Sequence, residues 1–137
     1  MEQPTEVRLG DYLVHLDADL MFVRAFGVVG PEIARGLVRC MRQLQERHGR
    51  YFILCDLREA GPMPAESRRI FIEFGKQNPL PLAVAFYHVG LMVRGANALL
   101  FSALNLLGKQ RQNMRQFSAE QEARSWLAAE RARLTPA

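Results

Sequence analysis

The sequence predicts a single α/β domain over residues 1–137, in which a mixed β-sheet is flanked by helices in the order ββαβαβαβα. Short, nearly continuous apolar runs alternate with longer segments whose apolar residues recur every three or four positions, as expected of strands covered by amphipathic helices. Gly- and Pro-containing breaks separate these segments. The composition, 49% hydrophobic and 23% charged, is typical of a folded chain with one core.

The chain opens with two runs that predict an antiparallel hairpin. Residues 7–16 and 20–26 are rich in apolar side chains, and three polar or small residues, 17–19, separate them. A short turn between two such runs is typical of paired strands. Pro31 then predicts the first turn of a helix, because its missing N–H costs nothing there.

A helix over residues 31–48 and a buried strand after it are the clearest elements. The helix has one apolar stripe with spacings of four, four and three: Ile33, Leu37, Met41 and Leu44. Gly49 is a favourable residue for ending the helix. The apolar run 51–55 is typical of a strand covered on both faces. Cys55 within that run is interpreted as a small buried hydrophobe rather than a reactive thiol.

The rest of the chain continues the alternation of helices and strands. The expected elements are a helix over 65–76, a strand over 82–87, a helix from about 94 to 108, a strand around 113–117 and a helix from Ser118. Ser118 with Gln121 three residues later forms a capping-box pattern, which supports that last helix start.

The third helix is apolar around most of its circumference. Its predicted core stripe comprises Ala96, Leu99, Leu100, Ala103 and Leu107. Phe101, Leu104 and Leu106 lie off that stripe, so either neighbouring elements cover them or the helix rests on a partner. We therefore predict an interface through Phe101, Leu104 and Leu106, formed with a second copy as a homodimer or with a protein partner. Arg94 would belong to its polar rim.

Charge and composition exclude several classes of protein. The net charge is +4, but the basic residues are dispersed, which argues against nucleic-acid binding. No apolar stretch is long enough for a transmembrane segment, and the polar N-terminus does not resemble a secretory signal. Two cysteines without a C-x-x-C motif do not form a disulfide scaffold, so a cytoplasmic location is expected.

No catalytic or cofactor motif is present. The sequence lacks a Walker loop, a G-x-G-x-x-G fingerprint after a strand and a G-x-S-x-G elbow. The histidines, His15, His48 and His88, fall in separate predicted elements without ligand spacing, so no metal site is expected. We predict that the protein is not an enzyme and uses no cofactor.

Candidate binding residues follow two of the predicted buried strands. Asp56 and Arg58 come directly after the run 51–55, Ser67 lies in the first turn of the next helix, and His88 ends the run 82–87. In open α/β sheets, ligands bind near the carboxyl ends of strands. We therefore predict ligand or partner binding through the following residues: Asp56, Arg58, Ser67, His88 and Arg94. Alternatively, Asp56 and Arg58 form a local charge pair, Ser67 only caps its helix, and His88 is structural.

Two short motifs resemble a known family. The strand that ends in Asp-Leu-Arg at 56–58, and the stretch 114–127, in which Phe117 precedes a Glu-Ala-x-x-Trp-Leu helix, are similar to SpoIIAA-like (STAS/SEC14-type) domains. These domains are relatives of the anti-sigma-factor antagonists. The resemblance implies a module that binds partners or small apolar ligands without catalysis. The antagonists' phosphorylated Asp-Ser-Ser-Gly-type segment is replaced by Pro-Ala-Glu-Ser-Arg-Arg at 64–69.

The expected function is that of a non-catalytic regulatory module, which binds a protein partner through its helix faces. The alternative is a carrier or sensor of a small apolar or lipid-like ligand. A closed cavity lined by the third helix and the sheet would favour the carrier. An exposed apolar groove would favour the protein partner.

Overall fold

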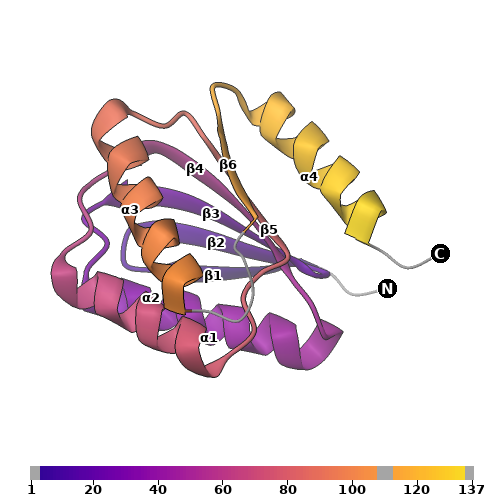
Figure 1. Cartoon of the computed structure of the whole chain (residues 1–137), viewed down its shortest axis with the longest axis horizontal. Helices are drawn as coiled ribbons and strands as arrows, with labels where there is room; N and C mark the ends of the chain where they lie inside the picture. The colour runs from indigo at the N-terminus through magenta and orange to yellow at the C-terminus, as the bar shows by residue number, and fades with distance from the viewer. Residues whose placement is uncertain (1–3, 108–112, 135–137) are drawn as a thin grey trace.

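The computed structural model describes residues 4–107 and 113–134, with the side chains of 92, 96, 101 and 104–107 left out (Figure 1). These residues form one six-stranded mixed sheet with helices on both faces, so the predicted α/β class is confirmed. The elements are β1 Thr5–Leu9, β2 Tyr12–Asp17, β3 Leu20–Gly27, α1 Pro31–His48, β4 Phe52–Ala60, α2 Ala65–Gln77, β5 Ala83–Tyr87, α3 Leu91–Leu107, β6 Met114–Phe117 and α4 Glu120–Leu134. In these ranges no helix is long and apolar enough to cross a membrane.

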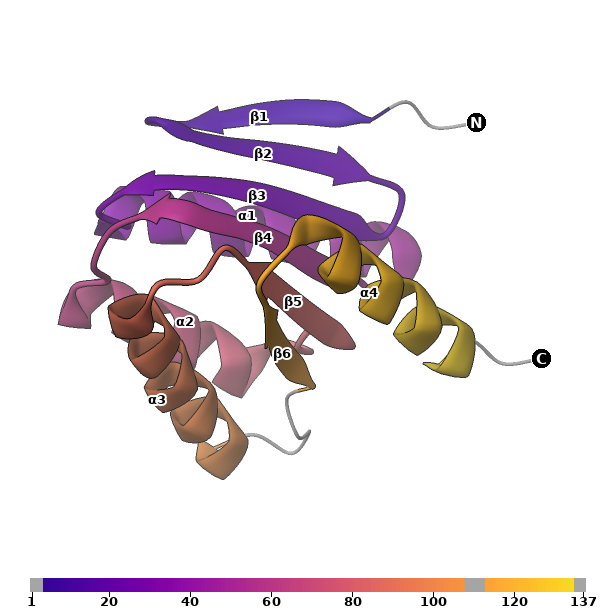
Figure 2. The ribbon, with the colours of Figure 1, turned by 90° about the horizontal axis from the view of Figure 1, so that it is seen from above.

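The strands lie side by side in chain order, from β1 to β6. The strand β2 is antiparallel to both of its neighbours, β1 and β3. The strands β4, β5 and β6 then continue parallel to β3. Parallel crossovers are almost always right-handed, so a chain that moves one way across the sheet leaves its crossover helices on one face. Accordingly, α1, α2 and α3 share one face, and α4, which follows the last strand, packs on the other (Figure 2).

The N-terminal hairpin contains one strand more than expected. The run 7–16 was predicted as a single strand, but Gly10 and Asp11 form a turn that divides it into β1 and β2. Gly10 has φ of +59°, a conformation that glycine adopts without the clash a side chain would introduce. The observed order is therefore βββαβαβαβα, and the predicted antiparallel pairing before α1 holds between β2 and β3.

The two runs expected to be interior strands are interior. The run 51–55 belongs to β4, between β3 and β5, and the run 82–87 belongs to β5, between β4 and β6. β4 is longer than predicted because its pairing with β3 continues past an irregularity between Arg24 and Phe26, as far as Ala60.

The helix α4 seals the face of the sheet that it covers. Ala123 and Leu127 of α4 are buried against Leu54 and Ala85 of the central strands. The Asp19 carboxylate anchors the helix, because it accepts hydrogen bonds from Arg131 of α4 and from Arg50. The helix begins at Glu120, two residues after the predicted start at Ser118. The carbonyl of Ala119 accepts the Ala123 N–H as the first hydrogen bond of the helix.

The described part of α3 confirms Leu100 of the predicted core stripe and contradicts Leu99. Leu99, assigned to the core, is 74% exposed, whereas Asn97 and Leu100 are each 7% exposed. A helix that is apolar on nearly every side lacks the contrast that would define its inner face. The orientation of α3 therefore depends on its packing beside α2.

Candidate ligand cavity and strand-end polar cluster

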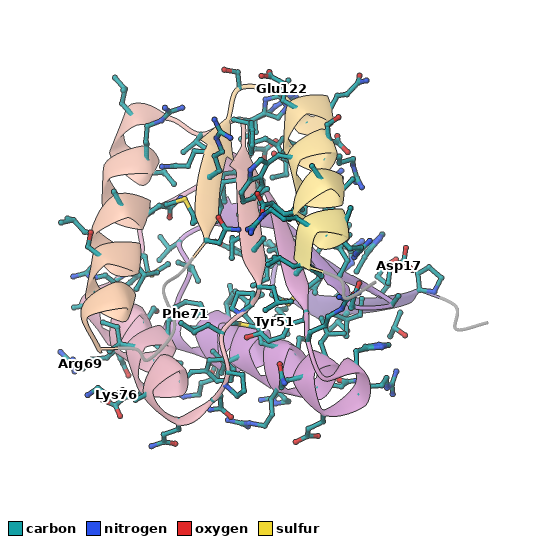
Figure 3. All side chains as sticks on the ribbon, turned by 45° about the vertical axis from the view of Figure 1, so that its right-hand side comes forward. Asp17, Tyr51, Arg69, Phe71, Lys76 and Glu122 are labelled. Carbon is teal, nitrogen blue, oxygen red and sulfur yellow. The ribbon has the colours of Figure 1, made fainter. Side chains whose placement is uncertain are left out.

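A cavity of about 530 Å³ lies between the sheet and the three helices on its α1–α3 face. Its floor consists of side chains on the central strands: Met21, Val23, Ala25, Ile53, Cys55, Val84 and Phe86. α1 contributes Leu37 and Met41, α2 contributes Phe71 and Phe74, and α3 contributes Val93, Asn97 and Leu100. Figure 3 labels Phe71, which reaches the cavity from α2. Leu100, although buried, belongs to neither of the two packed clusters of the core, because the cavity separates it from the sheet.

The cavity is buried at its base and reaches the surface beside the loop between β4 and α2. Ile53, Leu80 and Val84 at the base are buried, whereas Pro62 and Arg68 near the loop are exposed. This opening is at the edge of the sheet where β3, β4 and β5 end. Ligands of open α/β sheets characteristically bind at that edge.

Few polar groups occur among the described residues that line the cavity, and none of those at its base is charged. The Tyr12 hydroxyl donates to the carbonyl of Gly27 at 3.1 Å. Arg68 donates to the carbonyl of Met63 at 2.7 Å. Burial, with a smaller contribution from Asp56, raises the pKa of Cys55 to about 12, so its thiol stays neutral. The interior therefore favours apolar groups and disfavours ions.

The loops around the opening are held together by a short series of hydrogen bonds. The Gly61 N–H donates to the Gly27 carbonyl at 2.8 Å, and the Val29 N–H donates to the Pro62 carbonyl at 3.2 Å. A Cβ atom on Gly61 would lie 2.7 Å from the backbone carbon of Gly27, so only glycine permits this approach. The opening is thus positioned before any ligand arrives.

Ser67, a predicted binding residue, belongs to this set of hydrogen bonds. Its side chain is completely buried, and its hydroxyl donates to the carbonyl of Val29 at 2.7 Å. It lies in the first turn of α2 as predicted, but that helix has no side-chain cap, so the capping role expected as the alternative is wrong. Ser67 fastens α2 to the loop before α1.

Three of the predicted residues, Asp56, Arg58 and His88, come together on the α4 face of the sheet. The Asp56 carboxylate accepts the backbone N–H of Arg58 at 3.1 Å and lies 3.7 Å from the guanidinium of Arg24. The guanidinium of Arg58 lies 2.9 Å from Nε2 of His88. The expected position of Asp56 at a strand end is wrong, because β4 continues to Ala60. Asp56 is instead level with Tyr87, the last residue of β5.

The same cluster extends to α4 through Tyr87, Glu120 and Arg124. Burial and the nearby carboxylates of Asp56 and Glu120 raise the pKa of Tyr87 to about 12. A 2.7 Å hydrogen bond from Arg124 lowers the pKa of Glu120, and a bond from Tyr87 adds to this. These charges are paired with one another, and the sheet separates them from the cavity.

Arg94 and the predicted interface lie on α3. Arg94 is exposed in the first turn, where its backbone N–H donates to the Gly90 carbonyl. The side chains of the predicted interface residues lie outside the described part of the helix: Phe101, Leu104 and Leu106. On the described part, Leu91 and Leu99 are 89% and 74% exposed.

Sequence reasoning did not identify the buried amide Asn97 in the wall of the cavity. A signal was present, because Val93, Asn97 and Leu100 follow one another at spacings of four and three, which places them on one face of a helix. Cavity volume has no such signal, since the described residues that enclose it come from seven different elements.

Comparisons with known proteins add no family to these observations. No protein-family model matches the chain, and no curated protein has significant similarity to it. Among the described residues, no three histidine, cysteine, aspartate or glutamate side chains are grouped to hold a metal ion.

Proposed function

We propose that this protein is a non-catalytic carrier or sensor that binds a small, predominantly apolar ligand between its sheet and α3. The observation that carries the proposal is the cavity of about 530 Å³. Binding sites for small molecules are typically 300–1,000 Å³ in volume and are lined mainly by apolar side chains with a few polar groups.

The lining supports binding over simple loose packing. Protein interiors are normally packed as densely as organic crystals, so side chains around a space of this size lack contacts that a filled core would provide. An apolar ligand would supply those contacts, and its own surface would be removed from water. Binding to the folded state alone would then raise the stability of the protein.

The separation of polar and apolar groups supports a non-catalytic role. Asp56, Arg58 and His88 lie on the α4 face, so a ligand in the cavity would not touch them. The cavity polar groups Tyr12 and Arg68 already donate to backbone carbonyls.

The neutral, buried thiols of Cys40 and Cys55 support a reducing, cytoplasmic setting. The run of parallel strands, each followed by a helix, supports a place among SpoIIAA-like (STAS/SEC14-type) modules.

Binding of N-phenyl-1-naphthylamine, an uncharged probe that fluoresces in apolar surroundings, tests the proposal. We expect Val84→Trp, which fills the cavity from its floor, to weaken binding at least tenfold, or about 1.4 kcal/mol. Val28→Trp is the matched control, because Val28 is half exposed and outside the cavity lining. Ala25→Phe fills the floor from another strand and should weaken binding in the same way.

The thermal midpoints of these variants provide the check on folding. The variants Val84→Trp and Ala25→Phe should unfold at or above the wild-type temperature, because their larger side chains occupy the cavity that is already present. Absence of probe binding to the wild type, or equal binding by Val84→Trp and Val28→Trp, would disprove a ligand role for the cavity.

A partner docked on the outer side of α3 is a second candidate function. The exposed side chains of Leu91 and Leu99 on one helix favour it, since apolar groups gathered on one exposed face are typical of an interaction site. Light scattering of the wild type and of Leu91→Glu/Leu99→Glu tests whether this face joins two copies. A dimer that the double variant dissociates would support self-association, and two monomers would leave only a different protein as the partner.

A further inference from the structure

Asn97 is the exception to the apolar surface that α3 presents to the cavity. It lies between Val93 and Leu100 on the same helix face and is 7% exposed. Its amide nitrogen is 3.5 Å from the side-chain oxygen of Gln116, the outer limit of a hydrogen bond. Among the side chains and backbone groups that the structure describes, none donates to the oxygen of the Asn97 amide.

The Asn97 amide makes one long hydrogen bond to the described protein groups and keeps 7% of its surface accessible to solvent. Groups withdrawn from water need hydrogen-bond partners, and a leucine at this position would place no polar atom in the cavity wall. A ligand hydroxyl or carbonyl beside Asn97 would provide the missing partner. The amide offers both an acceptor and a donor, so either group could be bound.

The other polar groups of the lining are less able to select a ligand. The hydroxyl of Tyr12 already donates to a backbone carbonyl, and the thiol of Cys55 is a weak donor. Arg68 is exposed, so water satisfies the rest of its guanidinium whether or not a ligand is present. Asn97 is therefore the group whose hydrogen bonding changes most when the cavity is occupied.

We infer that Asn97 is a specificity-determining residue that selects apolar ligands carrying a hydroxyl or carbonyl group against hydrocarbons of the same shape. The inference rests on the proposed binding function. It deepens that function by naming the ligand class, an apolar body with one hydrogen-bonding group positioned toward α3. Sites built to pair with a polar group discriminate strongly, because the wrong ligand leaves a buried group unpaired.

Two probes of nearly equal shape, 2-naphthol and 2-methylnaphthalene, test the inference by displacement of N-phenyl-1-naphthylamine. The measured quantity is the ratio of their dissociation constants, because that ratio cancels effects on the cavity as a whole. We expect Asn97→Leu and Asn97→Ala to lower the preference for 2-naphthol at least tenfold relative to wild type. Leu99→Ala, on the exposed side of the same helix and outside the cavity lining, should leave the ratio unchanged.

The outcomes separate the two proposals. If both probes bind the wild type and the ratio is the same in the Asn97 variants, the role of Asn97 is wrong and the binding function stands. If neither probe binds the wild type, the binding function and the inference are both wrong. Two different substitutions guard against a folding defect in one variant, and circular dichroism verifies each.

Discussion

The two faces of the sheet are built from the same strands but are packed very differently. On the α4 face, Leu54, Ala85 and Ala123 are completely buried and in contact within one cluster. On the α1–α3 face, Ile53 and Val84 border a cavity of about 530 Å³. Ile53 and Leu54 are neighbours on β4. Ile53 faces the cavity, and Leu54 faces the packed core under α4.

The difference indicates a division of roles between the faces. The α4 face has small residues where helix and sheet approach, and the ion pair between Arg131 and Asp19 holds the C-terminal part of the helix there. The helix α3 makes its close backbone contacts with α2 rather than with a strand, as far as the described residues extend. The packed face thus stabilises the fold, and the face with the cavity is available for binding.

The largest expected effect comes from truncating neighbouring residues on β4. Leu54→Ala should lower the free energy of unfolding by about 3–5 kcal/mol, because it opens a void in a filled region. Ile53→Ala should lower it by about 2 kcal/mol, because the atoms removed already border open space. Urea denaturation measures both values. Equal losses would mean that the two faces are packed alike.

Removal of the Asp19 carboxylate should weaken the anchoring of α4. Asp19→Ala leaves Arg50 and Arg131 side by side without the anion between them, and we expect a loss of about 1–2 kcal/mol. Asp17→Ala is the control, since that aspartate is exposed two residues away, and it should change stability by less than about 0.5 kcal/mol. Probe binding should be unchanged in both variants, because the cavity is on the other face. Altered binding would show that the faces are coupled.

High pH should destabilise the packed face through Tyr87. Its pKa is about 12 in the folded protein and about 10 when unfolded, so the unfolded chain loses its proton first. The stabilisation is complete below about pH 10 and is lost as the pH rises toward about 12. Tyr87→Phe should therefore show a shallower fall in unfolding free energy above about pH 10 than the wild type. Identical slopes in urea titrations would contradict this.

Tyr12 supplies the corresponding measurement on the cavity face. Burial, with a smaller contribution from Cys55, raises its pKa to about 12 as well. Tyrosinate absorbance at about 295 nm should consequently develop late at both sites. A ligand that fills the cavity should delay Tyr12 further and leave Tyr87 unchanged, because only Tyr12 lines the cavity. A simultaneous shift of both residues would argue against independent faces.

The smallest expected effect is at the outer side of α3. Leu99→Glu should change the free energy of unfolding by less than about 0.5 kcal/mol, because the side chain is already in solvent. Chemical denaturation at several protein concentrations measures it. A loss above about 1 kcal/mol, growing with protein concentration, would show that this face is covered in an oligomer.

Local sequence determined the elements and most of their ends. Pro31 and Gly49 bound α1 as predicted, because proline suits a first helical turn and Gly49 adopts φ of +75°, which favours glycine. The apolar runs 51–55 and 82–87 are interior strands for a similarly local reason, since a run without polar alternation can be covered on both faces. Among the candidate site residues, Asp56 and Arg58 were expected beyond the end of a strand but lie within β4, and they meet His88 because β5 ends level with Asp56.

Tertiary structure alone decided the cavity, the exposure of Leu99 and the position of Asn97 in the wall. Hydropathy along α3 varies too little to define an inner face, so the neighbouring helix and the sheet determine its rotation. The cavity beneath α3 is the space that remains when the side chains from β2 to α3 do not fill the volume between the helices and the sheet. A local pattern reports whether a residue tends to be buried, but the space left between distant segments depends on all of them together.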